Sequence, residues 1–364
     1  MTKMRLFQCT TLYPGYLSRL NRLARFENTF AERQAVFLAD RHGAPHFLKP
    51  ILDRDPVAFE ANVNDHVHQR MWARENGMAG QPDPIEILLA QIEHHRTEVL
   101  YSMDPVALPT SFIRRLPSCV KKTIGWRAAP TKGADFTAYD LIVSNFPKLL
   151  QEYEAAGCRV AAFYPAHDPQ QDRYAANQDR PVDAVFVGSY TRHHGSRNRL
   201  LEEISKIGDR YKVVIHLEAS RLTKQIQASP LRWVPFLPYK LPATLQKVVR
   251  EPVFGVSLYE ALSRAKVVLN CSINDAGEER GNIRCFEAMG CGCVMLSDKG
   301  RYPEEMRPGD NMMTYDNPLD AITRLEELLA DPTRLREIGN RAHASVSRFY
   351  SKERQLQAFY ALVS

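Results

Sequence analysis

The feature that most constrains the fold is the segment from Ser263 to Lys299, in which strand-like and helix-like patterns alternate. An apolar run at 267–271 (VVLNC) has the length and the β-branched content of a buried strand. A polar loop follows, and a helix is expected to begin near Ile283 and to end at Gly290. A second apolar strand is expected at 294–296. In an open α/β sheet, such a unit places its first loop at the carboxyl end of the strand, where ligands bind.

Two glutamates, Glu279 in the loop and Glu287 in the expected helix, lie eight positions apart. A carboxylate accepts two hydrogen bonds, which suits the paired hydroxyls of a ribose or a hexose. Four residues stand between them at the expected helix N-terminus: Gly281, Asn282, Ile283 and Arg284. Free backbone N–H groups and the helix dipole favour a phosphate there, and the arginine could add a forked contact. The alternative is that Glu287 only complements the helix dipole and that Glu279 is solvated.

The spacing of these glutamates, together with the run FEAMGCG, resembles the donor-binding signature of retaining GT-B glycosyltransferases of the group 1 type. The arginine and cysteine that frame this run are similar to the CgeB-like (spore-maturation) subgroup. The resemblance covers the chain from about residue 180 onward and is loose before that. It implies that Glu279 contacts the transferred sugar and that Glu287 contacts the nucleotide ribose.

The same resemblance implies an α/β GT-B fold, with two Rossmann-like doubly wound domains facing each other across a cleft. The expected organisation is an acceptor-binding domain at 1–170, a linker at 171–181, a nucleotide-sugar-binding domain at 182–348, and a helix at 349–364 that packs back on the first domain. The reaction in such enzymes needs no metal and no cofactor besides the donor, because helix amides and basic side chains offset the charge of the leaving diphosphate.

Composition fits this frame. The chain has 364 residues, 44% hydrophobic and 25% charged, as in a globular protein of two domains. No apolar stretch approaches the roughly 20 residues of a membrane span, and the first residues do not form a signal peptide. Seven cysteines without metal-like spacing indicate reduced thiols and a cytoplasmic protein. The net charge of +6 suits anionic ligands and equally peripheral contact with the anionic inner face of a membrane.

The first half of the sequence alternates between expected strands and helices, which is typical of a parallel sheet covered on both faces. Strands are expected at 4–10, 46–52, 98–103, 121–127 and 140–145, and helices at 17–39, 83–95 and 108–116. Gly15 follows the first strand, either as a close approach to a ligand or as an ordinary Pro-Gly turn. By the resemblance, Asp104 and His167 point toward the acceptor cleft, with turn capping as the alternative.

Two patterns contain residue types that can bind metal ions. Asp53 and Asp55 form a D-x-D, but a proline and an expected helix follow, so helix capping explains the pair better than a metal does. The histidines at 66, 68, 94 and 95 lack cysteine or carboxylate partners at ligand spacing and are expected at the surface or in a hinge. We therefore expect no metal. Arginines at 19, 22 and 25 form either a solvated helix face or a basic patch.

The second half opens with an expected strand at 182–187 and a glycine-containing turn. By the resemblance this turn grips the diphosphate, although Ser189 and His194 replace the family's arginine and lysine. The candidate contacts are Gly188, Ser189, Arg192, His194 and Arg197. A basic surface turn that caps a helix is the alternative.

The expected function is transfer of a sugar from a nucleotide-sugar donor to a glycan, a lipid-linked glycan or another hydroxyl acceptor. A catalytically silent nucleotide-sugar-binding protein is one alternative, because the phosphate turn is substituted. An epimerase or phosphorylase on the same fold is another. The absence of a Walker A or G-x-G-x-x-G motif argues against a nucleotide triphosphatase or a dinucleotide enzyme. The basic residues are dispersed, so no nucleic-acid partner is expected.

Overall fold

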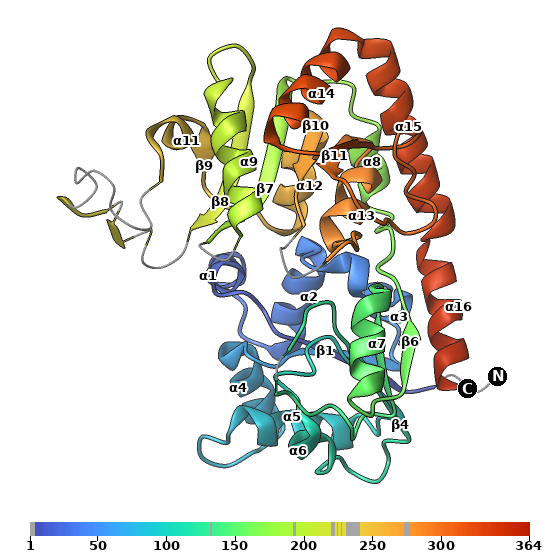
Figure 1. Cartoon of the computed structure of the whole chain (residues 1–364). Helices are drawn as coiled ribbons and strands as arrows, with labels where there is room; N and C mark the ends of the chain where they lie inside the picture. Colours follow the sequence, from blue (N-terminus) through green and yellow to red (C-terminus); the bar gives the residue numbers. More distant parts are fainter. Residues whose placement is uncertain are drawn as a thin grey trace. The chain divides into compact units, whose positions relative to one another are not determined.

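The computed structural model describes residues 4–364 except 132, 192–193, 220–222, 224, 227, 231–240 and 273–276. The chain forms two compact units, Met1–Pro165 with Lys352–Ser364, and Ala166–Ser351. Each unit is built on its own six-stranded sheet (Figure 1). Among the described residues, no helix is both long and apolar enough to cross a membrane.

In the first unit all strands are parallel, in the order β2-β1-β3-β4-β5-β6. The strands are β1 (Leu6–Thr10), β2 (Ala58–Asn62), β3 (Val99–Ser102), β4 (Lys122–Trp126), β5 (Leu141–Ser144) and β6 (Val160–Ala162). The chain moves from β1 to β2 on one side and returns to β3 on the other side of β1. The carboxyl ends of β1 and β3 therefore form the topological switch point of this unit.

The helices of the first unit connect these strands and cover the sheet. They are α1 (Pro14–Leu23), α2 (Phe30–Asp40), the 3₁₀ turn η1 (Ala44–His46), α3 (Lys49–Leu52), α4 (His66–Glu75), α5 (Pro84–His94), α6 (Thr110–Ile113), α7 (Pro147–Ala155) and α16 (Lys352–Val363). The core contains Phe7, Leu100 and Ile142, whose side chains are fully buried. The apolar side chains of the central strands thus form the core of the first unit.

Two expectations for the first unit are wrong. The strand expected at 46–52 is instead the end of η1 followed by α3, because Pro45 and Pro50 stand at the first positions of these two helical segments and favour a helix start. The single helix expected at 17–39 is two helices. Thr29 ends the break between them, since its hydroxyl accepts from the amide of Glu32 and the Glu32 carboxylate accepts in return.

Helix α16 joins the first unit through a buried lysine. The ammonium group of Lys352 donates to the carbonyl oxygens of Ala44, Pro45 and Phe47 at 2.7, 3.1 and 2.7 Å, and to Oε1 of Gln355 at 3.0 Å. Lys352 is 2% exposed. These contacts satisfy a buried charge with several oxygen acceptors, which fixes the start of α16.

The second unit has a parallel sheet in the order β12-β11-β10-β7-β8-β9. The strands are β7 (Val182–Tyr190), β8 (Val213–Ala219), β9 (Val249–Arg250), β10 (Ala265–Asn270), β11 (Val294–Asp298) and β12 (Met313–Tyr315). The chain passes from β7 to β8 and β9 and then returns to β10 on the other side of β7. The switch point of this unit is therefore at the carboxyl ends of β7 and β10.

The helices of the second unit pack in two groups. α9 packs against α11 and α14, whereas α8 packs against α12 and α13. Their bounds are α8 (Gln171–Ala175), α9 (Gly195–Lys206), α11 (Ala243–Val248), α12 (Gly255–Ser263), α13 (Ile283–Gly290), α14 (Pro318–Ala330) and α15 (Pro332–Phe349). The predicted strand–loop–helix–strand segment is confirmed as β10, α13 and β11.

Two local expectations for the second unit need correction. The segment 171–181, expected as a linker, begins with α8, and the buried side chain of Gln171 donates to the carbonyl oxygen of Glu287 at 3.2 Å. β7 does not end at residue 187. Gly188 and Ser189 lie within it, because β8 extends far enough to pair with both.

Candidate functional site

Arg197 connects the end of β7 to the segment after β10, at the switch point of the second unit. It lies in the first turn of α9, and its Nη2 donates to the carbonyl oxygen of Cys271, just after β10, at 2.9 Å. Its Nη1 donates to Oγ of Ser189, near the end of β7, at 3.4 Å. Burial lowers the pKa of the guanidinium from its ordinary value. A cation thus lies where a parallel sheet of this order binds its ligand.

The other expected phosphate contacts are less well placed. Arg192 lies outside the described residues. His194 is the residue before α9 and is half-buried. A side chain at Gly188 would put its Cβ 2.8 Å from the ring of Phe186, so this position packs against the strand itself. Among the described candidates, Arg197 carries a charge and contacts both Ser189 at the end of β7 and the carbonyl oxygen of Cys271 after β10.

The N-terminus of α13 is not capped by its own N-cap side chain. Asn282 is the N-cap residue, but its side-chain amide donates to Oδ1 of Asn270 on β10 at 3.2 Å, and it makes no capping bond. Gly281 before it has a φ of 116°, which favours glycine. Ile283 begins the helix. Among the described residues, the side chain of Asn282 therefore leaves the first-turn N–H groups of α13 uncapped at the carboxyl end of β10.

Glu287 and Arg284 bind each other. Nη1 of Arg284 donates to Oε2 of Glu287 at 2.5 Å, and the two side chains are 17% and 6% exposed. Burial raises the pKa of Glu287, while the neighbouring guanidinium acts in the opposite direction. The sequence assigned these side chains to two different parts of a ligand. The structure shows that the arginine is first of all the counterion of the glutamate.

Glu279 is held beside a second loop. The backbone of residues 278–280 runs along Arg301, with hydrogen bonds of 2.8 Å from Arg280 N to Arg301 O and from Arg301 N to Glu278 O. A Cβ on Gly300 would lie 2.5 Å from Glu278 O, so this approach requires a glycine. The carboxylate of Glu279 is 5% exposed, and its Oε1 lies 3.7 Å from Nη2 of Arg301.

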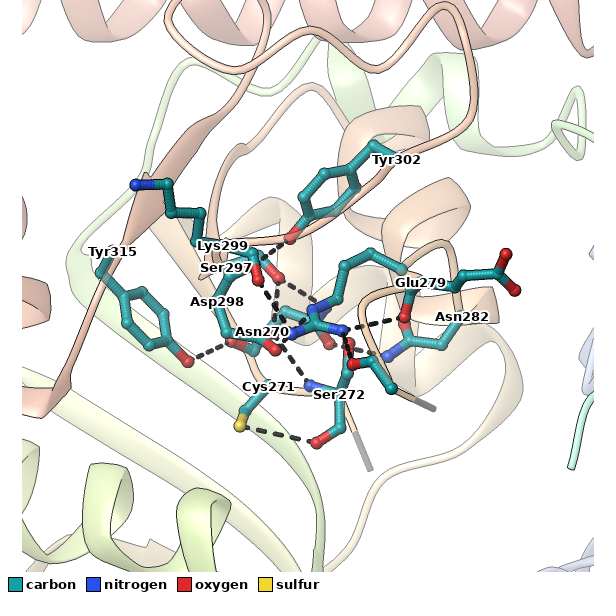
Figure 2. A network of polar contacts seen from close by, with 12 residues as sticks. Asn270, Cys271, Ser272, Glu279, Asn282, Ser297, Asp298, Lys299, Tyr302 and Tyr315 are labelled. Atoms are coloured by element: carbon teal, nitrogen blue, oxygen red, sulfur yellow. Dashed lines mark hydrogen bonds and ion pairs between the residues drawn. The ribbon is translucent and has the colours of Figure 1, made fainter. Parts of the chain in front are cut away.

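A polar network fixes the loop after β10 to the neighbouring strands, and the Glu279 carboxylate points away from it (Figure 2). Nε of Arg280 lies 2.6 Å from Oδ2 of Asp298, whose Oδ1 accepts from the amide of Ser272 at 3.0 Å. The hydroxyl of Tyr315 donates to the carbonyl oxygen of Asn270 at 2.8 Å. The network holds the backbone that carries Glu279, and the carboxylate extends away from the network.

A cavity of about 500 Å³ lies next to this network. Its charged lining residues are Arg199, Arg280, Asp298, Lys299 and Asp316. None of the sequence-predicted donor contacts that the structure describes lines it. The cavity lies at the ends of β10, β11 and β12 and beside the start of α9, from which Ser196, Arg199 and Leu200 line it.

Sequence reasoning missed the residues that fix the site, namely Arg301, Arg280 and Asp298. A signal was present, because Asp298 ends the second strand of the organising segment and Arg301 follows it closely. Both positions lie at the carboxyl end of a strand that neighbours β10. The rule that ligands bind at the carboxyl ends of parallel strands selected the loop after β10. The same rule would have selected these two positions as well.

The three expected acceptor-side residues are found in different settings. Gly15 is not in a loop, because α1 begins at Pro14. Oδ2 of Asp104 accepts from the hydroxyl of Thr11 at 2.5 Å, which joins the loops after β1 and β3 at the switch point of the first unit. His167 belongs to the second unit and lies 2.7 Å from a carboxylate oxygen of Asp172.

The rejected metal patterns of the first unit have ordinary roles. Asp53 pairs with Lys49 at 2.5 Å, and Asp55 accepts from the amide of Val57. Contrary to the expectation of surface histidines, His68 and His95 are buried. Burial lowers the pKa of each to about 4, so both rings are neutral near pH 7.

The exposed arginine face of α1 is smaller than the sequence indicates. Arg19 forms a two-pronged ion pair with Asp40, with distances of 3.0 and 2.7 Å. Arg22 and Arg25 are exposed. Arg22 lies in the last turn of α1, whereas Arg25 lies in the turn after it, with its guanidinium 4.5 Å from the centre of the Phe26 ring. The solvated-face interpretation therefore explains most of this pattern.

Comparisons with known proteins bear on the family and on the fold. Residues 192–361 match a protein-family model described as "Glycosyl transferase-like". HepE of Anabaena, solved with UDP-glucose, is 15% identical over 99% of both chains, with a TM-score of 0.60. Sucrose-phosphate synthase of Thermosynechococcus elongatus is 11% identical over 99% of this chain and 98% of that one, with a TM-score of 0.52.

A glycosyltransferase of Rickettsia africae is 9% identical over 100% of this chain and 98% of that one, with a TM-score of 0.53. No curated protein matches the sequence significantly. At these identities the structural likeness establishes the fold, and the expected GT-B fold is confirmed. The family match relates residues 192–361, most of the second unit and part of α16, to glycosyl transferases. The CgeB-like subgroup remains a prediction.

Proposed function

We propose that this chain transfers a sugar from a UDP-sugar to a hydroxyl group of a glycan or lipid-linked acceptor, with retention of configuration and without a metal ion in the reaction. One observation carries the proposal. Two buried carboxylates, Glu279 and Glu287, flank the uncapped N-terminus of α13 beside the switch point of the second unit. Sugar and ribose hydroxyls are the ligands that such a pair suits.

In this proposal the donor lies across the carboxyl ends of β7 and β10. Glu287 accepts the ribose hydroxyls, while the first-turn amides of α13 and the guanidinium of Arg197 hold the diphosphate. Arg284 keeps the buried carboxylate of Glu287 charged and oriented. We assign the diphosphate to Arg197 because its guanidinium contacts both the end of β7 and the segment after β10. The uridine base is favoured because HepE of Anabaena was solved with UDP and with UDP-glucose.

The reaction breaks the bond between the anomeric carbon of the sugar and the diphosphate oxygen and forms a bond from that carbon to the acceptor oxygen. The acceptor proton passes to the leaving phosphate, so no dedicated base is needed. Glu279 accepts hydrogen bonds from the transferred sugar and keeps it oriented. The positive end of α13 and Arg197 stabilise the charge that develops on the leaving group.

A catalytically silent sugar-nucleotide binder is the second candidate, because Ser189 and His194 stand where the resemblance has basic residues. The guanidinium of Arg197 lies 3.4 Å from the Ser189 hydroxyl, which supplies a cation next to that position. This contact favours the transferase over the silent binder. Acceptor binding by the first unit near Asp104, and peripheral contact with an anionic membrane, remain predictions.

The test is release of nucleoside diphosphate from UDP-, GDP-, CDP-, ADP- and dTDP-sugars, with and without a panel of hydroxyl acceptors. We expect acceptor-dependent release of UDP, and NMR of the product should show the anomeric configuration of the donor. Binding of a UDP-sugar without any release would favour the silent binder. Loss of donor without an acceptor product would indicate an epimerase or a phosphorylase.

A matched pair of variants tests the role of Glu279. Glu279→Gln should lower kcat roughly 30-fold, which corresponds to an increase of about 2 kcal/mol in the activation free energy. The affinity for UDP should stay close to that of the wild type. Glu278→Gln changes the neighbouring exposed glutamate and should turn over normally. A Glu279→Gln enzyme with unchanged kcat would refute the sugar contact.

A further inference from the structure

Two histidines and an aspartate converge in the second unit, beside the carboxyl end of α13. His167 precedes α8, Asp172 is in α8, and His343 is in α15. Nε2 of His167 lies 2.7 Å from Oδ1 of Asp172, and Nε2 of His343 lies 3.5 Å from the same oxygen. One possible ligand atom from each of the three residues lies within 4.8 Å of the others. The sequence did not indicate this group, because His343 is far from the other two along the chain.

We propose that His167, Asp172 and His343 form a binding site for a divalent transition-metal ion, with Zn²⁺ as the best fit. Imidazole nitrogens and a carboxylate oxygen are zinc ligands. With bonds of about 2.0–2.1 Å in tetrahedral geometry, neighbouring ligand atoms are about 3.3 Å apart. The 3.5 Å separation already matches this value, and the 2.7 Å one must widen by about 0.6 Å.

The carboxylate can make that movement, because the Asp172 side chain is 59% exposed. The histidines are better fixed. Nδ1 of His343 bonds to the carbonyl oxygen of Gly290 at 2.9 Å, which makes Nδ1 the protonated nitrogen and leaves the lone pair of Nε2 free. A backbone carbonyl in this position is a common outer-shell partner of a metal-bound histidine. The backbone N–H of His167 donates to the carbonyl oxygen of Tyr350 at 2.7 Å and anchors the second ring.

The surroundings of the His167 ring limit the affinity of the site. When Nε2 binds the ion, the proton resides on Nδ1, which has no hydrogen-bond partner among the described residues. A buried N–H without a partner offsets part of the free energy that the bonds to the metal provide. The site is therefore expected to bind zinc, but less tightly than a four-ligand site does.

The site has room for solvent as a fourth ligand, because the His343 side chain is 26% exposed. Its position indicates a structural role. His167 lies on the segment by which the chain enters the second unit at Ala166, and His343 lies on the helix that leads out toward Ser351. A bound ion would join these two segments, which the hydrogen bond from His167 to Tyr350 and the contact between the two histidine rings already connect. This role is separate from the transfer reaction, which is proposed to use no metal.

The experiment uses the full chain, stripped of metal and titrated with ZnCl₂ by calorimetry, with the melting temperature as a second readout. We expect one zinc ion per chain and a higher melting temperature in its presence, because a ligand of the folded state stabilises it. Asp172→Asn and His343→Gln should each weaken binding by at least the roughly 10–100-fold that loss of an outer-shell partner costs. Both should lose the zinc-dependent rise in melting temperature.

Two controls exclude other ligands. His66→Gln removes an exposed histidine, and Cys119→Ser removes the half-exposed thiol, so both should bind zinc as the wild type does. Co²⁺ in place of zinc should give the visible absorption of a tetrahedral site without a thiolate band. Absence of saturable binding at one ion per chain would overturn the proposal. So would undiminished binding by Asp172→Asn, whose exposed side chain makes misfolding an inadequate explanation.

Discussion

Glu287 offers the sharpest test of the donor site, because its carboxylate has two partners to lose. Within the protein it pairs with Arg284 at 2.5 Å, and in the proposed complex it also accepts the ribose hydroxyls. Glu287→Gln keeps the shape and removes the charge. Losing a charged hydrogen-bond partner should weaken UDP binding by about 2–3 kcal/mol, roughly 30- to 150-fold. The same change leaves a buried guanidinium without its counterion, which costs up to about 3–5 kcal/mol of folding free energy.

Both quantities can be measured on one sample. Calorimetric titration with UDP at a temperature well below the unfolding transition gives the affinity, and urea unfolding gives the stability. Adding Arg284→Met to Glu287→Gln removes the unpaired charge and should restore part of the stability without restoring UDP affinity. A folded Glu287→Gln protein with wild-type affinity for UDP would refute the ribose contact. Recovery of affinity in the double variant would show that Glu287 acts only by supporting the fold.

Two further predictions concern the first unit. Lys352→Met should lower the free energy of unfolding by about 3–5 kcal/mol in urea denaturation, because it removes a buried ammonium group that donates to three carbonyl oxygens and to Gln355, whereas Lys206→Met at an exposed position should change it by less than about 0.5 kcal/mol. Acid should also destabilise this unit, since burial lowers the pKa of His46 to about 3 and of His68 to about 4. The unfolded chain takes up these protons as the pH falls through about 6.5 while the folded one does not, so each ring should cost about 2 kcal/mol at pH 5 relative to pH 7. Equal unfolding free energies at pH 7 and pH 5 would show that the two rings are not held neutral by burial.

The sequence predicts well what is encoded locally. The β10–α13–β11 segment, the parallel strands and most helix starts follow from apolar runs, prolines and glycines that act within a few residues. The positions of Glu279 and Glu287 at the carboxyl end of β10 follow from the same pattern. The strand expected at 46–52 fails for a local reason as well, because the prolines in that apolar run favour helix starts over strand pairing.

What the sequence does not predict depends on contacts between distant residues. The ion pair of Arg280 with Asp298, which fixes the loop that carries Glu279, requires two strand ends to be neighbours. The contacts of Lys352 with carbonyl oxygens at 44–47 join positions some three hundred residues apart. Neither pattern has a spacing signature, because the sheet order decides which loops meet. The sequence therefore predicts the kind of site but not the residues that hold its loops in place.

The membership of α16 in the first unit has a consequence for how the protein is made. Residues 4–165 leave the ribosome first, but the segment that begins at Lys352 is translated only after the whole of Ala166–Ser351. Until then the carbonyl oxygens at 44–47 lack the ammonium group that they bind in the finished protein. The first unit therefore cannot complete its fold until the whole of the second unit has been synthesised. This differs from the usual vectorial sequence, in which the N-terminal domain is finished first.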